Sequence, residues 1–231
     1  MADRGRLHAL GRAGGRRGSE AARVLRTPPY RIETERLVIR CYDPRDAPLL
    51  KDAVDSSLDH LRPWMPWAHE APIPAEQVVD LLRRFRGQFD LEQDFVYGIF
   101  SPDESETVGG TGLHTRSGAS SFEIGYWIRA SRVGEGLCTE ATAALTRVGF
   151  ELCGAERIEI RVDPTNTASL AIRRKLGYVD EGTLRSVLHD PGGAPQQRDA
   201  VVFALLRREL AQSPAATAAL EAFDAAGGKI F

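Results

Sequence analysis

The sequence RVGEGLCTEA, residues 132–141, places two glycines directly before a predicted amphipathic helix. Gly134 and Gly136 let the backbone turn tightly and let a ligand approach it closely. Several N–H groups and the positive end of the helix dipole can then face one anion. The segment therefore predicts a phosphate-binding loop, with a pyrophosphate as the expected ligand. Because glycine pairs also occur in ordinary turns, the flanking segments have to carry the interpretation.

The segments around this loop are consistent with it. FEIGYWI, residues 122–128, reads as a strand that leads into the loop, and RIEIRV, residues 157–162, reads as an isolated strand after the helix. An Asn-x-x-Ser element within DPTNTASLAIRRKLGY, residues 163–178, opens a short helix that ends at Gly177. Upstream, LRPWMPW at residues 61–67 is a loop rich in proline and tryptophan.

Together these segments resemble the GNAT acetyltransferase superfamily, and they look most like its RimJ/RimL branch of ribosomal-protein N-terminal acetyltransferases and their small-molecule relatives. The resemblance covers roughly residues 30–210. It implies an α+β fold, in which a central, mostly antiparallel sheet is splayed at the acetyl-CoA site and flanked by helices. Acetyl-CoA would be the cosubstrate, no metal would be needed, and a homodimer through edge strands would be compatible with the family.

The hydrophobic pattern predicts the remaining elements. ERLVIRCYD, residues 35–43, alternates as a half-buried strand does. Apolar residues at helical spacing predict helices at residues 74–90 and 137–153, with Gly154 at the C-terminal cap of the second. The other predicted strands cover residues 95–100, 107–114, 178–188 and 199–206.

Composition divides the chain into three parts. With 231 residues and 42% hydrophobic content, it has one sizeable core, which we place in an acetyltransferase domain at residues 30–210. Residues 1–29 are rich in arginine and lack periodic apolar positions, which predicts a disordered extension, with a transit peptide or a nucleic-acid-binding arm as the alternatives. Residues 211–231 read as an Ala-rich C-terminal helix or tail.

Charge and cysteine content narrow the function classes. The first 31 residues carry a net charge of +6. Because the whole chain has a net charge of −2, the remaining residues carry −8. An acidic domain disfavours nonspecific nucleic-acid binding and fits a cationic amine substrate. The three cysteines are too few and too scattered for a zinc site or a disulfide framework. No Gly-Lys-Ser/Thr element follows the glycines, which argues against ATP binding.

The sequence contains no apolar run of about 18 to 20 residues and no hydrophobic signal core at its start. We therefore expect a cytoplasmic protein without a membrane partner.

The resemblance assigns two sets of residues to acetyl-CoA. The pantetheine arm would lie along the splayed strand at Trp127, Ile128 and Arg129. The pyrophosphate loop would consist of Arg132, Val133, Gly134, Glu135, Gly136, Leu137 and Cys138. Two positions depart from the family pattern, because Ser131 replaces the usual Gln or Arg and Glu135 brings a carboxylate into an anion-binding loop. Arg132 can supply the missing positive charge.

Acetyl transfer to an amine requires a neutral amine and a stabilised thiolate leaving group. The resemblance makes Glu123 the candidate base, acting through one water, with a surface glutamate as the alternative interpretation. It makes Ser169 the candidate acid and a cofactor contact, with an ordinary helix-start serine as the alternative. The tyrosine that many GNAT enzymes use is replaced by Arg173 here.

Two further residues are candidates for the site. Asn166 resembles the residue that orients the pantetheine end of the cofactor, although asparagine in a DPTN sequence is also common turn chemistry. His114 lies at a strand end and is a second candidate base, because imidazole titrates near neutrality. It ranks below Glu123.

Trp64, Met65 and Trp67 lie between prolines and predict an aromatic wall beside the acceptor, where His114 would also contact the substrate. The alternative is that these residues only cap the core.

We predict direct transfer in a ternary complex to a primary amine, either a protein N-terminal α-amine or a small-molecule amine. Because an α-amine has a pKa near 7.8 and a lysine amine about 10.4, neutralising lysine costs about 3.5 kcal/mol more. An aminoglycoside or polyamine acetyltransferase and a noncatalytic acyl-CoA sensor or interaction module are the alternatives.

Overall fold

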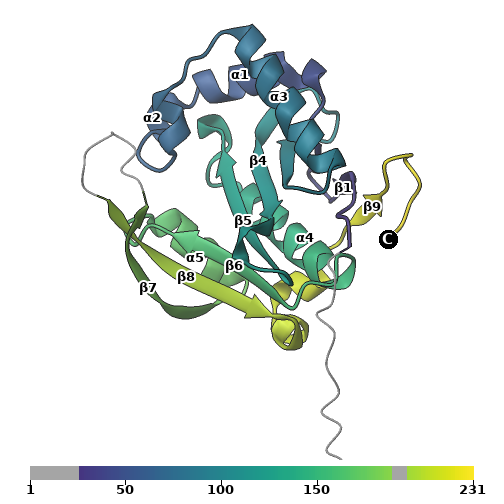
Figure 1. Ribbon diagram of the computed structural model, residues 1–231, viewed down its shortest axis with the longest axis vertical. Coiled ribbons are helices and arrows are strands. Elements are labelled where there is room, and N and C mark those ends of the chain that lie inside the picture. The colour runs from purple at the N-terminus through teal and green to yellow at the C-terminus, as the bar shows by residue number, and fades with distance from the viewer. Residues whose placement is uncertain (1–25, 189–196) are drawn as a thin grey trace, which may run out of the picture.

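A mixed sheet of nine strands runs through the part of the chain that the computed structural model describes, residues 26–188 and 197–231 (Figure 1). The strand order is β7-β8-β6-β5-β4-β3-β2-β1-β9. The strands are β1 (Arg31–Glu33), β2 (Val38–Cys41), β3 (Phe95–Phe100), β4 (Thr107–His114), β5 (Ser121–Ile128), β6 (Arg157–Val162), β7 (Val179–Leu188), β8 (Arg198–Leu206) and β9 (Glu221–Phe223). All neighbours are antiparallel except β5 and β6. The α+β class and the mostly antiparallel sheet are therefore confirmed.

Helices flank this sheet. Within the described residues the α-helices are α1 (Ala47–Asp55), α2 (Leu58–Leu61), α3 (Ala75–Asp90), α4 (Leu137–Glu151) and α5 (Thr167–Lys175). Figure 1 shows α1, α2 and α3 gathered at the top of the view, away from α5. The predicted helix at residues 137–153 corresponds to α4, and Gly154 follows it in the left-handed region with a φ of +80°.

The side chains of β5 alternate between the two faces of the sheet. Phe122 and Ile124 pack into the core that α4 covers. Trp127 packs against the cluster formed with α1 and α3, and Glu123 and Gly125 share its side of the strand by alternation. The sheet therefore has an α4 face and an α1–α3 face.

β5 and β6 pair over only three residues. Ser121–Glu123 lies beside Arg157–Glu159 in parallel register. Beyond this point β5 continues to Ile128 and β6 to Val162, with no pairing between the two described strands. The resulting opening is the splay expected at the acetyl-CoA site.

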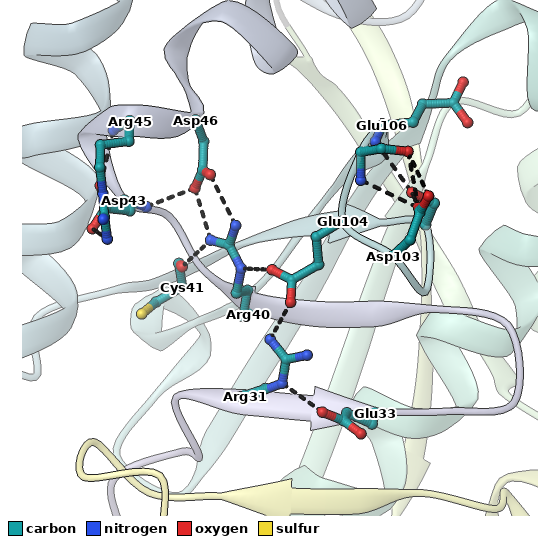
Figure 2. A network of polar contacts seen from close by, with 12 residues as sticks. Arg31, Glu33, Arg40, Cys41, Asp43, Arg45, Asp46, Asp103, Glu104 and Glu106 are labelled. Atoms are coloured by element: carbon teal, nitrogen blue, oxygen red, sulfur yellow. Dashed lines mark hydrogen bonds and ion pairs between the residues drawn. The ribbon is translucent and has the colours of Figure 1, made fainter.

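An ionic network fixes β1 and β2 to the start of α1 (Figure 2). Arg40 of β2 donates to the two carboxylate oxygens of Asp46 at 2.7 and 2.8 Å and also to Glu104 in the β3–β4 turn. Glu104 accepts a second bond from Arg31 of β1 at 2.6 Å. Asp46 is only 6% exposed and also accepts a hydrogen bond from the N–H of Asp43. Its ion pair with Arg40 therefore stabilises the fold more than an exposed surface ion pair does. The network anchors the α1–α3 side on the sheet.

The C-terminal segment corrects one prediction, because residues 211–231 form no α-helix. The chain forms two 3₁₀ segments and then β9: Arg207–Gln212, Pro214–Thr217 and Glu221–Phe223. Pro214 has no N–H to donate, and the Ser213 hydroxyl donates to the Leu176 carbonyl at 2.6 Å, so a continuous helix is interrupted. Ala222 is fully buried where β9 pairs with β1, and this burial outweighs alanine's helix propensity.

Most of the predicted N-terminal extension, residues 1–25, lies outside the described residues, as does most of the turn between β7 and β8. Residues 26–29 contact the domain. The Arg26 N–H donates to a carbonyl just after α4 at 2.8 Å, and the Tyr97 hydroxyl donates to the Pro29 carbonyl at 2.8 Å.

Candidate active site

A groove of about 1360 Å³ joins the α1–α3 face of the sheet to the opening between β5 and β6. All residues predicted for the site line this groove except Arg129 and Glu135. The remaining predicted residues therefore line one cavity, together with residues of the aromatic loop and of the glycine loop.

The glycine loop has the geometry of an anion cradle. Gly134 and Gly136 have φ values of +87° and +81°, a conformation that other residues rarely adopt. A Cβ on Gly134 would have no atom within 4 Å, so the backbone there is open to a ligand. No described side chain caps the N-terminus of α4, which leaves its first N–H groups available. Both features fit a pyrophosphate.

Arg36 supports this loop from outside, and no motif in the sequence identified it. Its guanidinium donates to the Glu135 carbonyl at 2.9 Å and forms an ion pair with Glu140 of α4 at 2.6 Å. The two contacts tie the loop to the first turn of the helix. The only signal in the sequence is its position near the start of the predicted strand at residues 35–43, which indicates no role.

The charges of Arg132 and Glu135 in the loop compensate each other. Arg132 donates to Glu135 at 2.9 and 3.1 Å and to Glu106 at 2.5 Å. The hydrogen bond from Arg132 lowers the pKa of Glu135, so both groups are charged at neutral pH. Arg129 also pairs with Glu106, at 3.1 Å. The positive charge of Arg132 is therefore shared between two carboxylates.

Trp127 connects the opening to the aromatic wall. Its indole lies above Gly110, where a Cβ would come within 2.5 Å of Nε1. Its ring meets Trp67 edge-on, with 5.8 Å between ring centroids. Trp67 is 40% exposed, so this part of the wall faces the groove and solvent and does not simply cap the core.

Ser169 and Asn166 occupy the start of α5. The Asn166 side chain accepts from the Ser169 N–H at 3.0 Å and so caps the helix. The Ser169 hydroxyl lies 2.8 Å from the hydroxyl of Tyr126, whose side chain points to the α4 face of β5. Burial raises the pKa of Tyr126. Arg173, at the position of the usual tyrosine, packs over the Phe203 ring at 4.0 Å.

The pairing of Tyr126 with Ser169 was not predicted. Tyr126 belongs to the quoted EIGYWI strand, but nothing local indicates that its hydroxyl reaches a residue 43 positions away.

Glu123 is not a surface glutamate. It is 6% exposed, and Arg116 donates to its Oε1 at 2.6 Å. Its Oε2 lies 3.4 Å from Nε of Arg161 and has no hydrogen-bond partner among the described residues. Both carboxylate oxygens therefore face guanidinium groups. Its role as base stays a prediction.

His114 is the cross-strand partner of Glu123, so both side chains lie on the same face of the sheet. Its Nδ1 lies 2.9 Å from both carboxylate oxygens of Asp94. Sequence reasoning missed Asp94, which belongs to no motif and lies 20 residues from His114. The groove therefore holds a carboxylate–imidazole pair beside the predicted base.

Within residues 26–188 and 197–231, no group of three or more His, Cys, Asp or Glu side chains is arranged to hold a metal ion. In the same residues, no helix has both the length and the apolar character needed to cross a membrane.

Comparisons with known proteins agree with this geometry. A family model described as the acetyltransferase (GNAT) domain matches residues 36–179. The ribosomal protein uS5-alanine N-acetyltransferase of Escherichia coli (strain K12) is 31% identical over 183 residues, which cover 77% of this chain and 91% of that protein. The putative ribosomal N-acetyltransferase YdaF of Bacillus subtilis (strain 168) is 28% identical over 181 residues, which cover 76% and 93%.

A solved structure of Mycobacterium smegmatis RimJ in complex with CoA-disulfide superimposes with a TM-score of 0.67. It is 28% identical, and the match covers 81% of this chain and 90% of that one.

Proposed function

Because the chain belongs to the GNAT acetyltransferase family, we propose that this acetyl-CoA-dependent N-acetyltransferase acts on the α-amino group of a protein N-terminus. The observation that carries the proposal is the continuous groove, which leads from the tryptophan-lined surface to the opening between β5 and β6. An extended N-terminus can enter such a groove end-on. The E. coli relative is named as an alanine N-acetyltransferase of ribosomal protein uS5, which supports a protein acceptor.

The energetics of the amine support the same acceptor. An α-amine needs about 3.5 kcal/mol less than a lysine amine to become neutral, so a single base in the groove suffices. The neutral nitrogen attacks the thioester carbonyl, a C–N bond forms, the C–S bond breaks, and the nitrogen loses one proton. The acetyl group passes directly between the two substrates in a ternary complex.

On the cofactor side we assign the pyrophosphate to the loop around Gly134 and Gly136, and the pantetheine arm to the unpaired edge of β5 at Trp127 and Ile128. Asn166 would act indirectly here, by fixing the start of α5. Acetyl-CoA supplies the activated acetyl group.

We assign the stabilisation of the leaving thiolate to the Ser169 hydroxyl. Because burial keeps Tyr126 protonated, its O–H can donate to the Ser169 oxygen, and the serine O–H is then free to donate to the sulfur. This arrangement stabilises the charge that develops as the C–S bond breaks.

On the acceptor side, Glu123 and His114 both face the groove and either can receive the amine proton. The wall of Trp64, Met65 and Trp67 would contact the first residues of the acceptor. We expect the reaction to take place in the cytoplasm, where a protein acceptor of this kind is made.

The proposal is tested by measuring CoA release with acetyl-CoA and a set of short peptides that differ in their first residue, beside aminoglycosides and polyamines at equal concentration. We expect turnover on at least one peptide with a kcat/KM at least tenfold above every small amine. A higher kcat/KM on an aminoglycoside or polyamine would show that the acceptor is a small-molecule amine and not a protein N-terminus. CoA binding without turnover on any amine would favour the sensor alternative.

A further inference from the structure

We propose that His114 is the base that takes the amine proton, at its Nε2 atom, and that Asp94 positions its ring. The inference deepens the proposed function and rests on it, because the acceptor amine must enter the groove. It replaces Glu123 as the proton acceptor and gives that carboxylate a different task.

The His114 ring lies in a space that two glycines leave free. A Cβ on Gly112 would come within 2.8 Å of both Cε1 and Nε2 of the ring, and a Cβ on Gly125 would come within 3.3 Å of Nε2. Gly112 and Gly125 are cross-strand partners on β4 and β5. Glycine weakens a strand interior, so a cross-strand pair of them is explained by the ring that they accommodate.

Asp94 fixes the orientation and the tautomer of this ring. Nδ1 lies 2.9 Å from both oxygens of the carboxylate, which can only accept hydrogen bonds. Nδ1 therefore carries the ring proton and donates a hydrogen bond to Asp94. In the neutral imidazole, Nε2 then has a free lone pair. Nε2 has no hydrogen-bond partner in the described part of the chain, and the side chain is 17% exposed in the groove.

The loop that carries Asp94 is itself held in place. The Thr115 hydroxyl donates to the Gln93 carbonyl at 2.9 Å, and the Gln93 N–H donates to the Gln88 carbonyl of α3 at 2.9 Å. The first bond ties the segment that presents the imidazole to the segment that presents the carboxylate, and the second ties the carboxylate segment to α3.

The position of Nε2 matches the geometry of the reaction. It lies over Gly125, two residues beyond the last β5–β6 pair at Glu123, and thus at the edge of the opening. It faces the α1–α3 side, whereas the hydroxyl pair of Tyr126 and Ser169 lies on the α4 side. The proton acceptor and the donor to the sulfur are then on opposite sides of the opening, as transfer between two substrates requires.

Both carboxylate oxygens of Glu123 are oriented toward arginines. Arg116 binds its Oε1 at 2.6 Å, and Arg161 faces its Oε2 at 3.4 Å. The charged groups that face the imidazole from neighbouring elements are thus Asp94, Glu123 and Arg116. The carboxylate of Glu123 anchors the arginines of the groove and acts as a positioning residue.

The amine nitrogen forms the C–N bond with the carbonyl carbon, its proton passes to Nε2 of His114, and the C–S electron pair leaves with the sulfur. The sulfur receives a hydrogen bond from Ser169 and takes a proton from solvent, to which the imidazolium returns its own. No oxidant or further co-reactant is needed.

The test uses the full chain and the best peptide acceptor, with His114→Ala, His114→Gln and Asp94→Asn. His114→Ala and His114→Gln should lower kcat by about 10²- to 10⁴-fold, while the Kd for CoA changes less than threefold. Added imidazole should restore at least tenfold of the lost kcat in His114→Ala, because the two glycines leave room for it. No such rescue is expected for His114→Gln, whose side chain fills the site.

Asp94→Asn should lower kcat by about 10- to 100-fold with less than a twofold change in peptide KM. Asp180→Asn, which changes an exposed carboxylate on β7, is the matched control and should leave kcat unchanged. The inference would be overturned if the kcat of His114→Ala were within threefold of wild type, or if imidazole did not restore it. Turnover of the peptide by wild type would in that case still support the proposed function. If wild type acetylates only a small amine, the acceptor proposal fails, and the kcat of the same variants is measured with that amine.

Discussion

Tyr126 of β5 and Ser169 of α5 are joined by a hydrogen bond of 2.8 Å on the α4 side of the sheet. The bond links the strand that would carry the pantetheine arm to the helix that Asn166 caps. It gives the serine hydroxyl a fixed direction, which an isolated helix-start serine would lack.

Replacing Ser169 by alanine should therefore lower kcat by about 10²-fold, because the leaving sulfur loses its hydrogen-bond donor. Tyr126→Phe removes one neutral hydrogen bond and should lower kcat by about 3- to 10-fold. Steady-state kinetics at saturating acetyl-CoA measures both effects. Wild-type kcat in Ser169→Ala would rule out the assigned role.

Breaking the ion pair between Arg132 and Glu135 should improve the binding of acetyl-CoA, whereas the preceding substitutions impair the reaction. Glu135→Gln should free Arg132 for the pyrophosphate and lower the KM for acetyl-CoA by about two- to fivefold, with a steeper dependence on salt. Glu221→Gln, which breaks an exposed ion pair with Lys229 on β9, serves as the control. An unchanged or raised KM in Glu135→Gln would mean that the carboxylate supports the loop.

Gly112 should resist substitution because of the His114 ring. Gly112→Ala forces a Cβ to within 2.8 Å of the imidazole and should cost about 1–3 kcal/mol of unfolding free energy. Gly87→Ala, in α3, meets no atom within 4 Å and should stabilise the protein by about 0.5–1 kcal/mol. Urea denaturation of the two variants gives the comparison. Equal effects would show that the ring does not need this space.

The cysteines should be unreactive in the folded protein. Burial raises the pKa of Cys138 and of Cys153 to about 12, and it also raises the pKa of Cys41. Because thiolate forms only as pH approaches the raised pKa, about one Cys138 thiol in 10⁴ is ionised at pH 8. Ellman's reagent at pH 8 should label all three thiols in urea and react only slowly in buffer. Rapid labelling of Cys138 in the native protein would contradict this prediction.

Much of the site could be predicted because its signals are local. The glycines of the phosphate loop stand beside a strand and a helix with clear periodicity, and alternation along β5 separates Glu123 from Tyr126. What could not be predicted comes from chain segments that meet only in the fold. Asp94 reaches His114 from the loop between α3 and β3, and the arginines around Glu123 come from other elements.

The C-terminal segment shows the same limit for secondary structure. Alanine content alone favours a helix, but the interruption at Pro214 and the pairing of β9 with β1 depend on tertiary contacts. Arg36 is a similar case, because its contact with the Glu135 carbonyl spans 99 positions in the sequence.

The most direct test of the account uses one peptide that carries both a free N-terminal alanine and an internal lysine. After incubation with enzyme and acetyl-CoA, tandem mass spectrometry locates the acetyl group. We predict a single acetyl group on the α-nitrogen, with turnover lost in His114→Ala. Acetylation of the lysine side chain, or of neither amine while a small-molecule amine is consumed, would contradict the assignment of an N-terminal acceptor.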